Sequence, residues 1–452
     1  IFANPIASLK EVDNKSKTWR TLGTTFAQYK LAEGLHAKVL FGADLNQLTE
    51  QYYLPSYIYE GSGNRGSAAL GSLESFSWLN ENTLTYDKAF ARHQLNVLVG
   101  FTQQESQTSL FNAGAEGFVS DELLANNLQS GGTLLRPNSD AYKWVLHSYL
   151  ARINYNYANT YYLSASIRRD GSSRFGSNNK WGNFPSLAFS WRLINEPFLS
   201  DLVPTLSDLK VRSSFGSTGN LEIGQYQSLS TLYALNYLFG DRVVPGFASQ
   251  RIPNANLGWE KTFQYDAGID LGFWNNRLAL TLDWYYKKTT DLLVDVEIPW
   301  TSGYASSLQN FGSVANKGVE VNIKSTNLQG TFTWTTDFNI SWNRNKVLAL
   351  GNGGSSYITG NYIIQVGQPL GTFYGTQVDG ILQIGEEDRL GAYTGLATPK
   401  AGDRRYKDVD GDGKFTSAAD RTVIGNAQPD FIFGLSNTLN YKNFDLSFLL
   451  QG

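Results

Sequence analysis

The sequence predicts an all-β chain in which about fourteen long antiparallel strands form part of a transmembrane β-barrel. Three observations predict it: apolar and polar residues alternate with period two, the alternating segments reach about ten residues, and their connections alternate between short and long. Strands that cross a bilayer need about nine to eleven residues, whereas soluble strands average about five or six. The strand length therefore favours a membrane barrel over a soluble β-sandwich or β-helix.

The predicted strands follow one another along the chain. Every second residue from Leu35 to Leu45 is apolar, and only Leu40 interrupts the alternation. The segment from Phe263 to Phe273 alternates without an exception. The same pattern predicts strands near 161–168, 278–286, 332–342 and 431–441. Aromatic residues gather near strand ends, as in the segment Asp283–Lys288, which is typical of the aromatic belts at membrane interfaces.

The polar face of these strands carries many charged residues. Such charges would be costly in the packed interior of a sandwich, so they favour a water-filled lumen. They are Asp266, Asp270, Glu320, Lys324, Asp337, Arg168 and Arg192.

Short and long connections alternate, as they do when tight periplasmic turns pair with long extracellular loops. Short connections are expected near Asn159, Asn275, Gly330 and Lys442. Long extracellular loops are expected at about 51–72, 104–142, 220–259, 291–316 and 351–428. Aromatic residues in or beside these loops suit contacts with sugar rings, although none is assigned to a substrate: Tyr57, Tyr59, Trp78, Tyr226, Tyr233, Tyr237 and Trp300.

Composition excludes several functions. The chain has 37 basic and 40 acidic residues and no basic run, so nucleic acid is not an expected partner. The absence of cysteine excludes disulfides, thiolate zinc sites and cysteine nucleophiles. No serine motif is followed by a suitable Asp and His, so we expect no enzyme. His36, His93 and His147 do not have metal-ligand spacing and are expected to be structural.

One segment has the spacing of a cation site. Asp408, Asp410 and Asp412 alternate, and Gly413 supplies a sharp turn, as in calcium-binding loops. The acidic residue at the end of the loop, Asp420, comes one position late, and the glutamate that would bind calcium through both oxygens is missing. We therefore expect either a Ca²⁺ site formed by these four residues or a solvated turn in which the aspartates cap backbone groups.

Several stretches, in order, resemble the SusC/RagA family of TonB-dependent outer-membrane transporters. The most specific is GDRRYKDVDGDGKFTSAADRTVIGNAQPDFIFGLSNTLNYKNFDLSFLLQG, from Gly402 to Gly452. Supporting stretches are Ser166–Gly176, Trp181–Leu199, Asn254–Leu293, Asn316–Ile323 and Gly367–Gln383. The resemblance covers almost the whole chain.

The resemblance implies a barrel of 22 strands in the outer membrane, plugged by an N-terminal domain and energised through TonB, with a SusD-like lipoprotein over its extracellular mouth. On this reading, residues 1–452 are the middle and later barrel strands, and the plug domain and last strands lie outside them. The expected function is import of a nutrient, with an oligosaccharide or other glycan as the leading substrate. A peptide importer of the same family and a non-transporting surface-binding protein are the alternatives.

Overall fold

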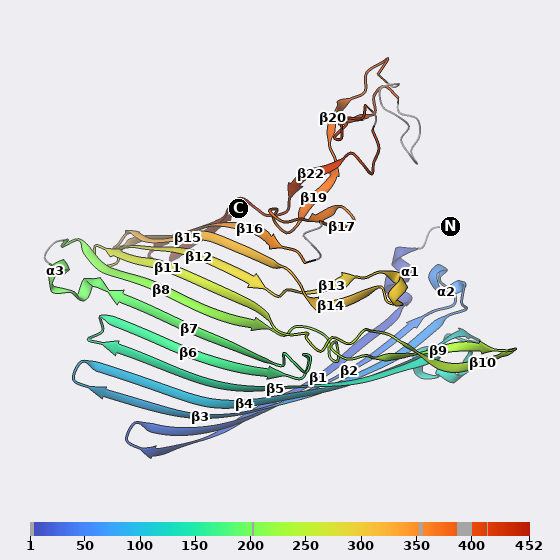
Figure 1. Cartoon of the computed structure of the whole chain (residues 1–452), viewed down its shortest axis with the longest axis horizontal. Coiled ribbons are helices and arrows are strands. Elements are labelled where there is room, and N and C mark those ends of the chain that lie inside the picture. The colour runs from blue at the N-terminus through green and yellow to red at the C-terminus, as the bar shows by residue number, and fades with distance from the viewer. Residues whose placement is uncertain (1–3, 201–202, 352–355, 387–399, 414) are drawn as a thin grey trace.

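One large curved sheet dominates the computed structural model, which describes residues 4–200, 203–351, 356–386, 400–413 and 415–452 (Figure 1). Among these residues, fourteen strands form this sheet, each antiparallel to its neighbours. In order they are β1 (Asp13–Ala32), β2 (Leu35–Leu54), β3 (Ser67–Phe90), β4 (His93–Phe118), β5 (Gly131–Tyr157), β6 (Tyr161–Ser172), β7 (Trp181–Arg192), β8 (Leu206–Asn220), β11 (Glu260–Phe273), β12 (Leu278–Thr290), β15 (Ser313–Leu328), β16 (Phe332–Ala349), β23 (Ile432–Tyr441) and β24 (Phe444–Gln451). The predicted fold class and strand number are confirmed.

Short and long connections lie at opposite ends of this sheet, at the left and right of Figure 1 respectively. The short turns predicted at Asn159, Asn275, Gly330 and Lys442 all join consecutive strands at the short-turn end. In the β1–β2 turn, Gly34 has a φ of 75°, and a Cβ there would clash with the carbonyl oxygen of Asp87. Glycine is therefore required at that position.

Two long loops are shorter than predicted. The predicted loop 51–72 is only 55–66, and the predicted loop 104–142 is only 119–130, because β2 to β5 continue into them. Strands β3, β4 and β5 contain 24, 26 and 27 residues, against 12 in β6 and in β7. Beyond the membrane both faces of a strand meet water, so hydrophobic alternation disappears while the backbone ladder continues. Alternation alone could not show these extensions.

The other long loops carry small structures of their own. Their strands are β9 (Leu232–Phe239), β10 (Arg242–Ser249), β13 (Leu293–Glu297), β14 (Ser306–Asn310), β17 (Tyr357–Thr359), β18 (Tyr362–Ile364), β19 (Thr372–Thr376), β20 (Val378–Ile381), β21 (Arg404–Tyr406) and β22 (Arg421–Asn426). The helices described are α1 (Pro5–Glu11), α2 (Tyr59–Ser62), α3 (Pro197–Ser200) and the 3₁₀ turns Leu124–Asn126, Leu128–Ser130, Leu193–Asn195 and Trp300–Ser302. Within the described part of the chain, no helix has the length and apolar character needed to span a membrane.

Aromatic rings form a continuous ladder at the short-turn end. Phe90 stacks on His93 with centroids 4.8 Å apart, and His93 lies 4.9 Å from Tyr157. Tyr157 stacks on Tyr161 at 6.3 Å, and Tyr161 stacks on Trp191 at 5.9 Å. The ladder therefore crosses strands β3 to β7 near their ends, as expected for an interfacial belt.

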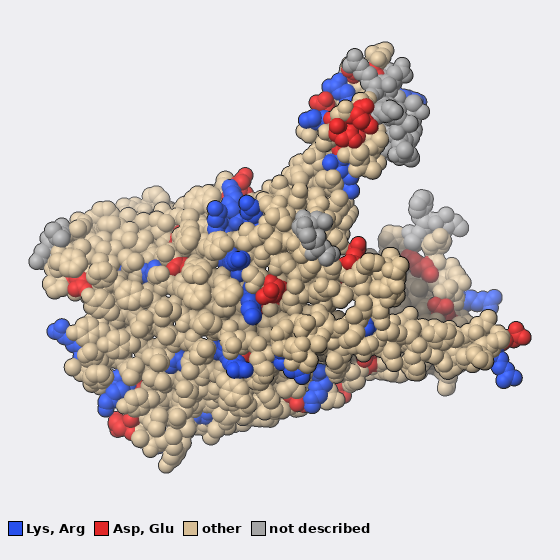
Figure 2. All heavy atoms as spheres, in the orientation of Figure 1, with Lys and Arg blue, Asp and Glu red and all other residues tan. Residues whose placement is uncertain are grey.

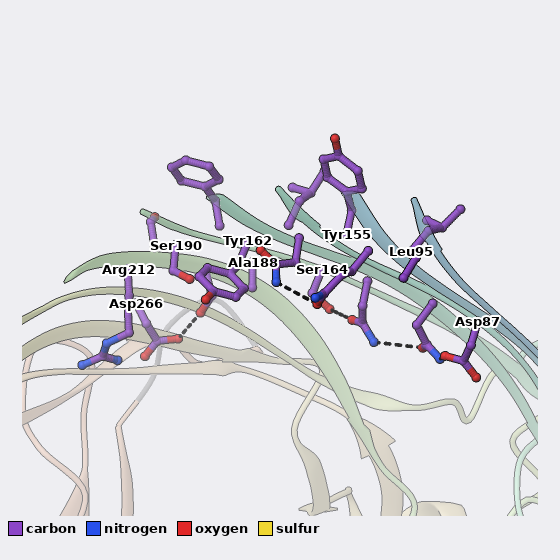
Figure 3. Close-up of a pocket in the computed structure, with 18 of the residues that line it drawn as sticks. Asp87, Leu95, Tyr155, Tyr162, Ser164, Ala188, Ser190, Arg212 and Asp266 are labelled. Carbon is purple, nitrogen blue, oxygen red and sulfur yellow. Dashed lines mark hydrogen bonds between the residues drawn. The ribbon is translucent and has the colours of Figure 1, made fainter. Parts of the chain in front are cut away.

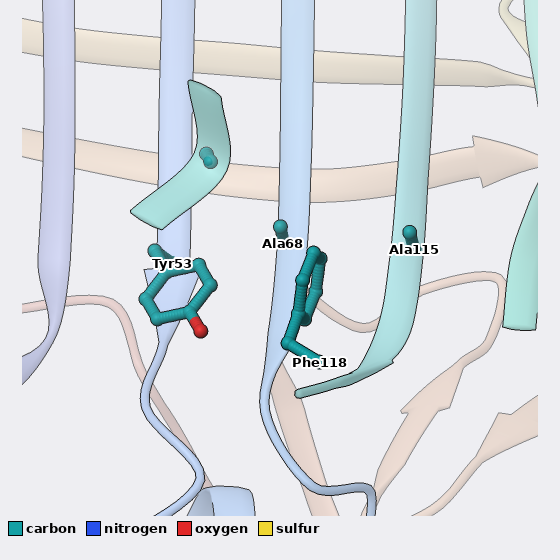
Figure 4. Packing of buried hydrophobic residues seen from close by; sticks show 5 residues of the cluster. Tyr53, Ala68, Ala115 and Phe118 are labelled. Atoms are coloured by element: carbon teal, nitrogen blue, oxygen red, sulfur yellow. The ribbon is translucent and has the colours of Figure 1, made fainter. Parts of the chain in front are cut away.

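A small buried cluster lies at the long-loop end of β2, β3 and β4, and Figure 4 shows its packing. Phe118 packs edge-on against Tyr53, with centroids 5.5 Å apart, and both rings contact small alanine side chains. The Tyr53 hydroxyl donates to Asp121 at 2.7 Å, and Ser56 donates to the same carboxylate from its backbone N–H at 2.9 Å and its hydroxyl at 2.7 Å. This cluster ties the loops 55–66 and 119–130 together.

Candidate functional site

Arg212 lies at the centre of a charged network on the concave face of the sheet. Its Nε and Nη2 atoms donate to the two Asp270 oxygens at 2.8 and 3.0 Å. Nη2 also contacts Asp283 Oδ1 at 2.9 Å, while the Thr281 hydroxyl donates to Asp270 at 3.2 Å. One cation thus joins two carboxylates from two other strands, and the site keeps a net negative charge.

Gly268 makes this arrangement possible. It pairs with Arg212 across β8 and β11 and with Asp283 across β11 and β12, so it lies between them. A Cβ at Gly268 would clash with Asp283 Oδ1 and lie 2.8 Å from Arg212 Nη2. The missing side chain leaves the guanidinium room to cross β11 and reach β12.

A ladder of polar side chains, neutral except for Asp87 at its end, continues this face toward β3. Asn96 donates to Asp87 at 2.7 Å, and Asn154 donates to Asn96 at 3.2 Å. Ser164 then donates to Asn154 at 2.6 Å. Each step crosses to the next strand, so the hydrogen bonds link β3, β4, β5 and β6 in one chain.

Six of the seven charged residues predicted for the polar face have a hydrogen-bond or ion-pair partner there; for the seventh, Glu320, the described residues provide none within these distances. Arg168 Nε lies 2.7 Å from Asp170, Arg192 Nε lies 3.1 Å from Asp208, and Lys324 Nζ lies 3.4 Å from Asp337. Asp266 accepts from Ser214 at 3.2 Å. A carboxylate or cation in this position keeps contact with water or with a partner, which explains why so many charges are tolerated.

A hollow of about 870 Å³ opens on this polar face, toward the short-turn end. Figure 3 shows Tyr162, Ser164, Arg212 and Asp266 on one side of the strands, while Tyr155 and Leu95 point to the other side. The hollow therefore presents hydroxyl, amide and carboxylate groups. Such groups can hydrogen-bond a hydrated solute or the polar surface of a protein segment lying in the lumen.

A second buried cluster joins three loops at the long-loop end. Phe175, Phe184, Leu257 and Trp259 are buried together, with Leu293 and Leu308 packed against them. The Trp259 indole donates to the Lys180 carbonyl oxygen at 3.0 Å. This cluster, here called the loop hub, connects loops 173–180, 221–259 and 291–312 at their bases.

Arg174 fastens the loop hub further. Its Nη1 donates to the carbonyl oxygens of Leu221 at 3.1 Å and Ile223 at 2.9 Å, and its guanidinium lies 4.9 Å from the Trp144 ring centroid. Burial lowers the pKa of Arg174, and the nearby carboxylate of Glu222 opposes that effect. An arginine stays charged despite such a shift, so the guanidinium remains a fixed donor to the loop backbone.

The structure brings three of the four predicted metal ligands together. One carboxylate oxygen each from Asp408, Asp410 and Asp412 lies within 4.8 Å of the others. The Asp408 oxygens accept from the backbone N–H groups of Gly411 at 2.6 Å and Gly413 at 2.8 Å. The loop therefore has the shape of a cation site, and calcium binding there stays a prediction.

Asp420 lies outside this group and has a different role. Its side chain is fully buried, and it accepts backbone N–H bonds from Thr416 at 2.6 Å, Val409 at 2.7 Å and Asp410 at 3.4 Å. The bond from Thr416, together with those from Val409 and Asp410, lowers the pKa of Asp420, although burial opposes the charge. Asp420 thus holds the two ends of the acidic loop together.

The loop aromatics divide between exposed and structural positions. Trp300, Tyr57 and Tyr59 are 81%, 63% and 55% exposed at the long-loop end. Trp78, predicted in or beside a loop, lies within β3 and stacks on Phe41 with centroids 6.3 Å apart. The sequence analysis did not predict the roles of Arg212 and Gly268. The feature that could have indicated them is a charged residue on one long strand and a glycine on the polar face of another.

A strongly curved antiparallel sheet with a polar concave face, aromatic belts and long loops at one end defines a class of outer-membrane barrel. The chain belongs to the family described as TonB dependent receptor-like, beta-barrel, which it matches over residues 6–448. It is an outer-membrane protein of the SusC/RagA type, so the short turns are periplasmic and the long loops extracellular.

Two receptors and one solved structure illustrate what the chain is similar to. The chain is 36% identical to TonB-dependent receptor P3 of Formosa agariphila over 99% of this chain and 46% of that receptor. It is 31% identical to TonB-dependent receptor SusC of Bacteroides thetaiotaomicron over 99% of this chain and 44% of SusC. It also resembles the solved RagAB peptide transporter, with 27% identity, a TM-score of 0.84, and coverage of 99% of this chain and 48% of that chain. The chain therefore spans about half the length of these relatives.

Proposed function

We propose that the protein to which this chain belongs imports a nutrient across the outer membrane, driven by TonB and assisted by a SusD-like surface lipoprotein. Membership of the TonB-dependent receptor family supports transport across the outer membrane that is driven by TonB. The polar concave face also supports it, because the Arg212 network and the Asn–Ser ladder place hydrogen-bonding groups on the wall that a solute would pass. TonB and the lipoprotein follow from the SusC and RagA type of the relatives.

The proposed substrate is an oligosaccharide. The observation that carries this choice is the set of exposed aromatic rings at the extracellular end, namely Trp300, Tyr57 and Tyr59. Aromatic faces pack on the apolar faces of sugar rings, while nearby polar groups bind their hydroxyls. The concave face below supplies such polar groups from asparagine, serine and aspartate side chains.

A peptide is the second candidate substrate. It is favoured by the likeness to the RagAB peptide transporter, whose TM-score of 0.84 reflects a closely similar strand arrangement. A peptide would use the same hydroxyl, amide and carboxylate groups through its backbone N–H and C=O groups.

The test is uptake of labelled oligosaccharides and peptides by cells expressing the full-length gene, with and without TonB and the neighbouring lipoprotein. We expect oligosaccharide uptake that needs all three components. Trp300→Ala should reduce it, whereas Trp274→Ala, which removes a 56% exposed ring at the opposite end, should not. Uptake of peptides alone would replace the glycan substrate with a peptide. Surface binding that never leads to uptake would replace import with a binding role.

A further inference from the structure

The convex face of β12, β15 and β16 carries aromatic rings at one level. Trp284 on β12 and Trp342 on β16 are 46% and 39% exposed, and each pairs with Val319 of the strand between them. Further toward the periplasm this face is apolar, with Leu282, Val321 and Ile340 in the next row. Tryptophans at this place mark the outer interface between hydrocarbon and head groups.

Four cations follow this aromatic row on its extracellular side. Alternation places Lys288 on the face of Trp284, Lys317 on the face of Val319, and Arg344 and Lys346 on the face of Trp342. Lys317 pairs directly with Arg344. Lys288 and Lys346 both pair with the small residue Ala315, so they stand on either side of it. These four residues lie two to four positions beyond Trp284, Val319 and Trp342 and are called here the basic patch. If the tryptophans mark the interface, the patch lies at head-group depth.

Figure 2 shows a column of blue side chains over β16, β15 and β12, with red carboxylate groups at its upper end and beside its lower end. Its charges are poorly balanced by the protein. Arg344 contacts Asp430 at 3.0 Å, but the two side chains are 57% and 87% exposed, so the pair contributes little. Among the described residues, no carboxylate lies within 4.0 Å of the Lys288, Lys317 or Lys346 ammonium group.

Lys317 and Arg344 stand directly opposite each other on β15 and β16. Like charges in that position destabilise the pairing of two strands. An anion between them removes that repulsion. Lysine and arginine bind phosphate strongly, through charge-assisted hydrogen bonds from several donors. At head-group depth on the outer leaflet, the phosphates available are those of the lipids themselves.

We propose that the basic patch binds the phosphate groups of a phosphorylated glycolipid in the outer leaflet, with Lys288, Lys317, Arg344 and Lys346 as the ligands. The lipid chains then lie against the apolar rows below Trp284 and Trp342. This site is separate from the import route, because it lies on the opposite face of the sheet from Arg212 and Asp270.

The test is lipid binding by the purified full-length protein, measured by native mass spectrometry after delipidation. The probes are bisphosphorylated lipid A and the same lipid without phosphates. We expect the variant K288Q/K317Q/R344Q/K346Q to bind the phosphorylated lipid about tenfold or more weakly than the native protein. The control K10Q/R242Q/K400Q/K407Q, which removes four exposed cations elsewhere, should bind like the native protein.

Two further measurements keep the result interpretable. Heat-modifiable gel migration reports whether each variant forms its barrel, and the smaller variant K317Q/R344Q should show a partial loss of binding if the larger one does not fold. A variant of the native protein in which arginine replaces Lys288, Lys317 and Lys346 keeps all four positive charges and should bind like the native protein. Equal binding by the patch and control variants overturns the proposal, as does equal binding of the two lipids. Displacement of the lipid by millimolar inorganic phosphate would also overturn it, since the site would then be one for free phosphate.

Discussion

Arg212 donates to Asp283 at 2.9 Å although the two residues stand on β8 and β12, which are separated by β11. Contacts between second-neighbour strands need a long side chain and an unobstructed path. Gly268 provides the path, so the charged network across β8, β11 and β12 depends on the missing side chain at this position.

Replacing Gly268 with alanine should break the Arg212–Asp283 contact, because the added Cβ occupies the place of the guanidinium and carboxylate. We expect a loss of about 1–3 kcal/mol in the free energy of unfolding, measured by urea unfolding of the full-length protein in lipid vesicles. Gly216→Ala is the control, since its Cβ would meet only Ser186 Cβ, at 3.7 Å. Equal stability of the two variants would refute this account.

Replacing Tyr53 with phenylalanine should loosen the loops 55–66 and 119–130. The ring still packs on Phe118, but the bond to Asp121 is lost, for a cost of about 1 kcal/mol. Hydrogen exchange in both loops should quicken several-fold. Tyr52→Phe is the matched control, since the next residue points to the other face of β2. A quickening of the same size in both variants would contradict the role of the hydroxyl.

Replacing Asp420 with asparagine should open the acidic loop. Its lowered pKa means that the charged carboxylate stabilises the folded loop above about pH 4, the ordinary value, and that this stabilisation is lost as the pH falls through the lowered pKa. Hydrogen exchange at Val409, Asp410 and Thr416 should therefore rise about tenfold in the variant at pH 7. Asp241→Asn, in the exposed β9–β10 turn, serves as control. Unchanged protection in D420N would exclude the proposed anchoring role.

Calcium should bind the loop that contains Asp408, Asp410 and Asp412, with a Kd of about 0.1–1 mM, as in extracellular modules. Isothermal titration calorimetry of the full-length protein measures this binding directly. Asp412→Asn should weaken it, whereas Asp445→Asn, on β24, should not. If the native protein and D412N give the same titration, the loop is a solvated turn held by its own backbone bonds.

The strands and the polar face could be predicted from the sequence because both depend on one local rule, the alternation of side chains between two faces. Asp266 and Asp270 were placed correctly on that basis. The Arg212 network could not be predicted in the same way, since it depends on how β8, β11 and β12 are registered. Register is a property of pairs of strands and not of any one segment.

The acidic loop shows a different limit. The spacing of Asp408, Asp410 and Asp412 predicted their convergence, and the three carboxylates do meet. The same spacing gave Asp420 a place among the ligands, whereas its oxygens accept three backbone N–H groups. An aspartate that binds metal and an aspartate that caps a loop cannot be told apart in the sequence. Only the backbone N–H groups around the carboxylate distinguish the two roles.

If the protein imports a nutrient as proposed, the loop hub determines where its loops can be altered to accept a new substrate. Hydrogen bonds between Asn254 and Leu308, at 3.1 Å, and between Gly258 and Asn310, at 2.7 Å, lock the bases of two loops together. The β9–β10 hairpin and the β13–β14 hairpin tip extend beyond these bonds. Exchange of either tip leaves the shared base intact, whereas a cut within the base disturbs three loops at once. Grafted loop segments and natural sequence changes should therefore be tolerated in the hairpin tips and should destabilise the protein when they fall within the shared loop bases.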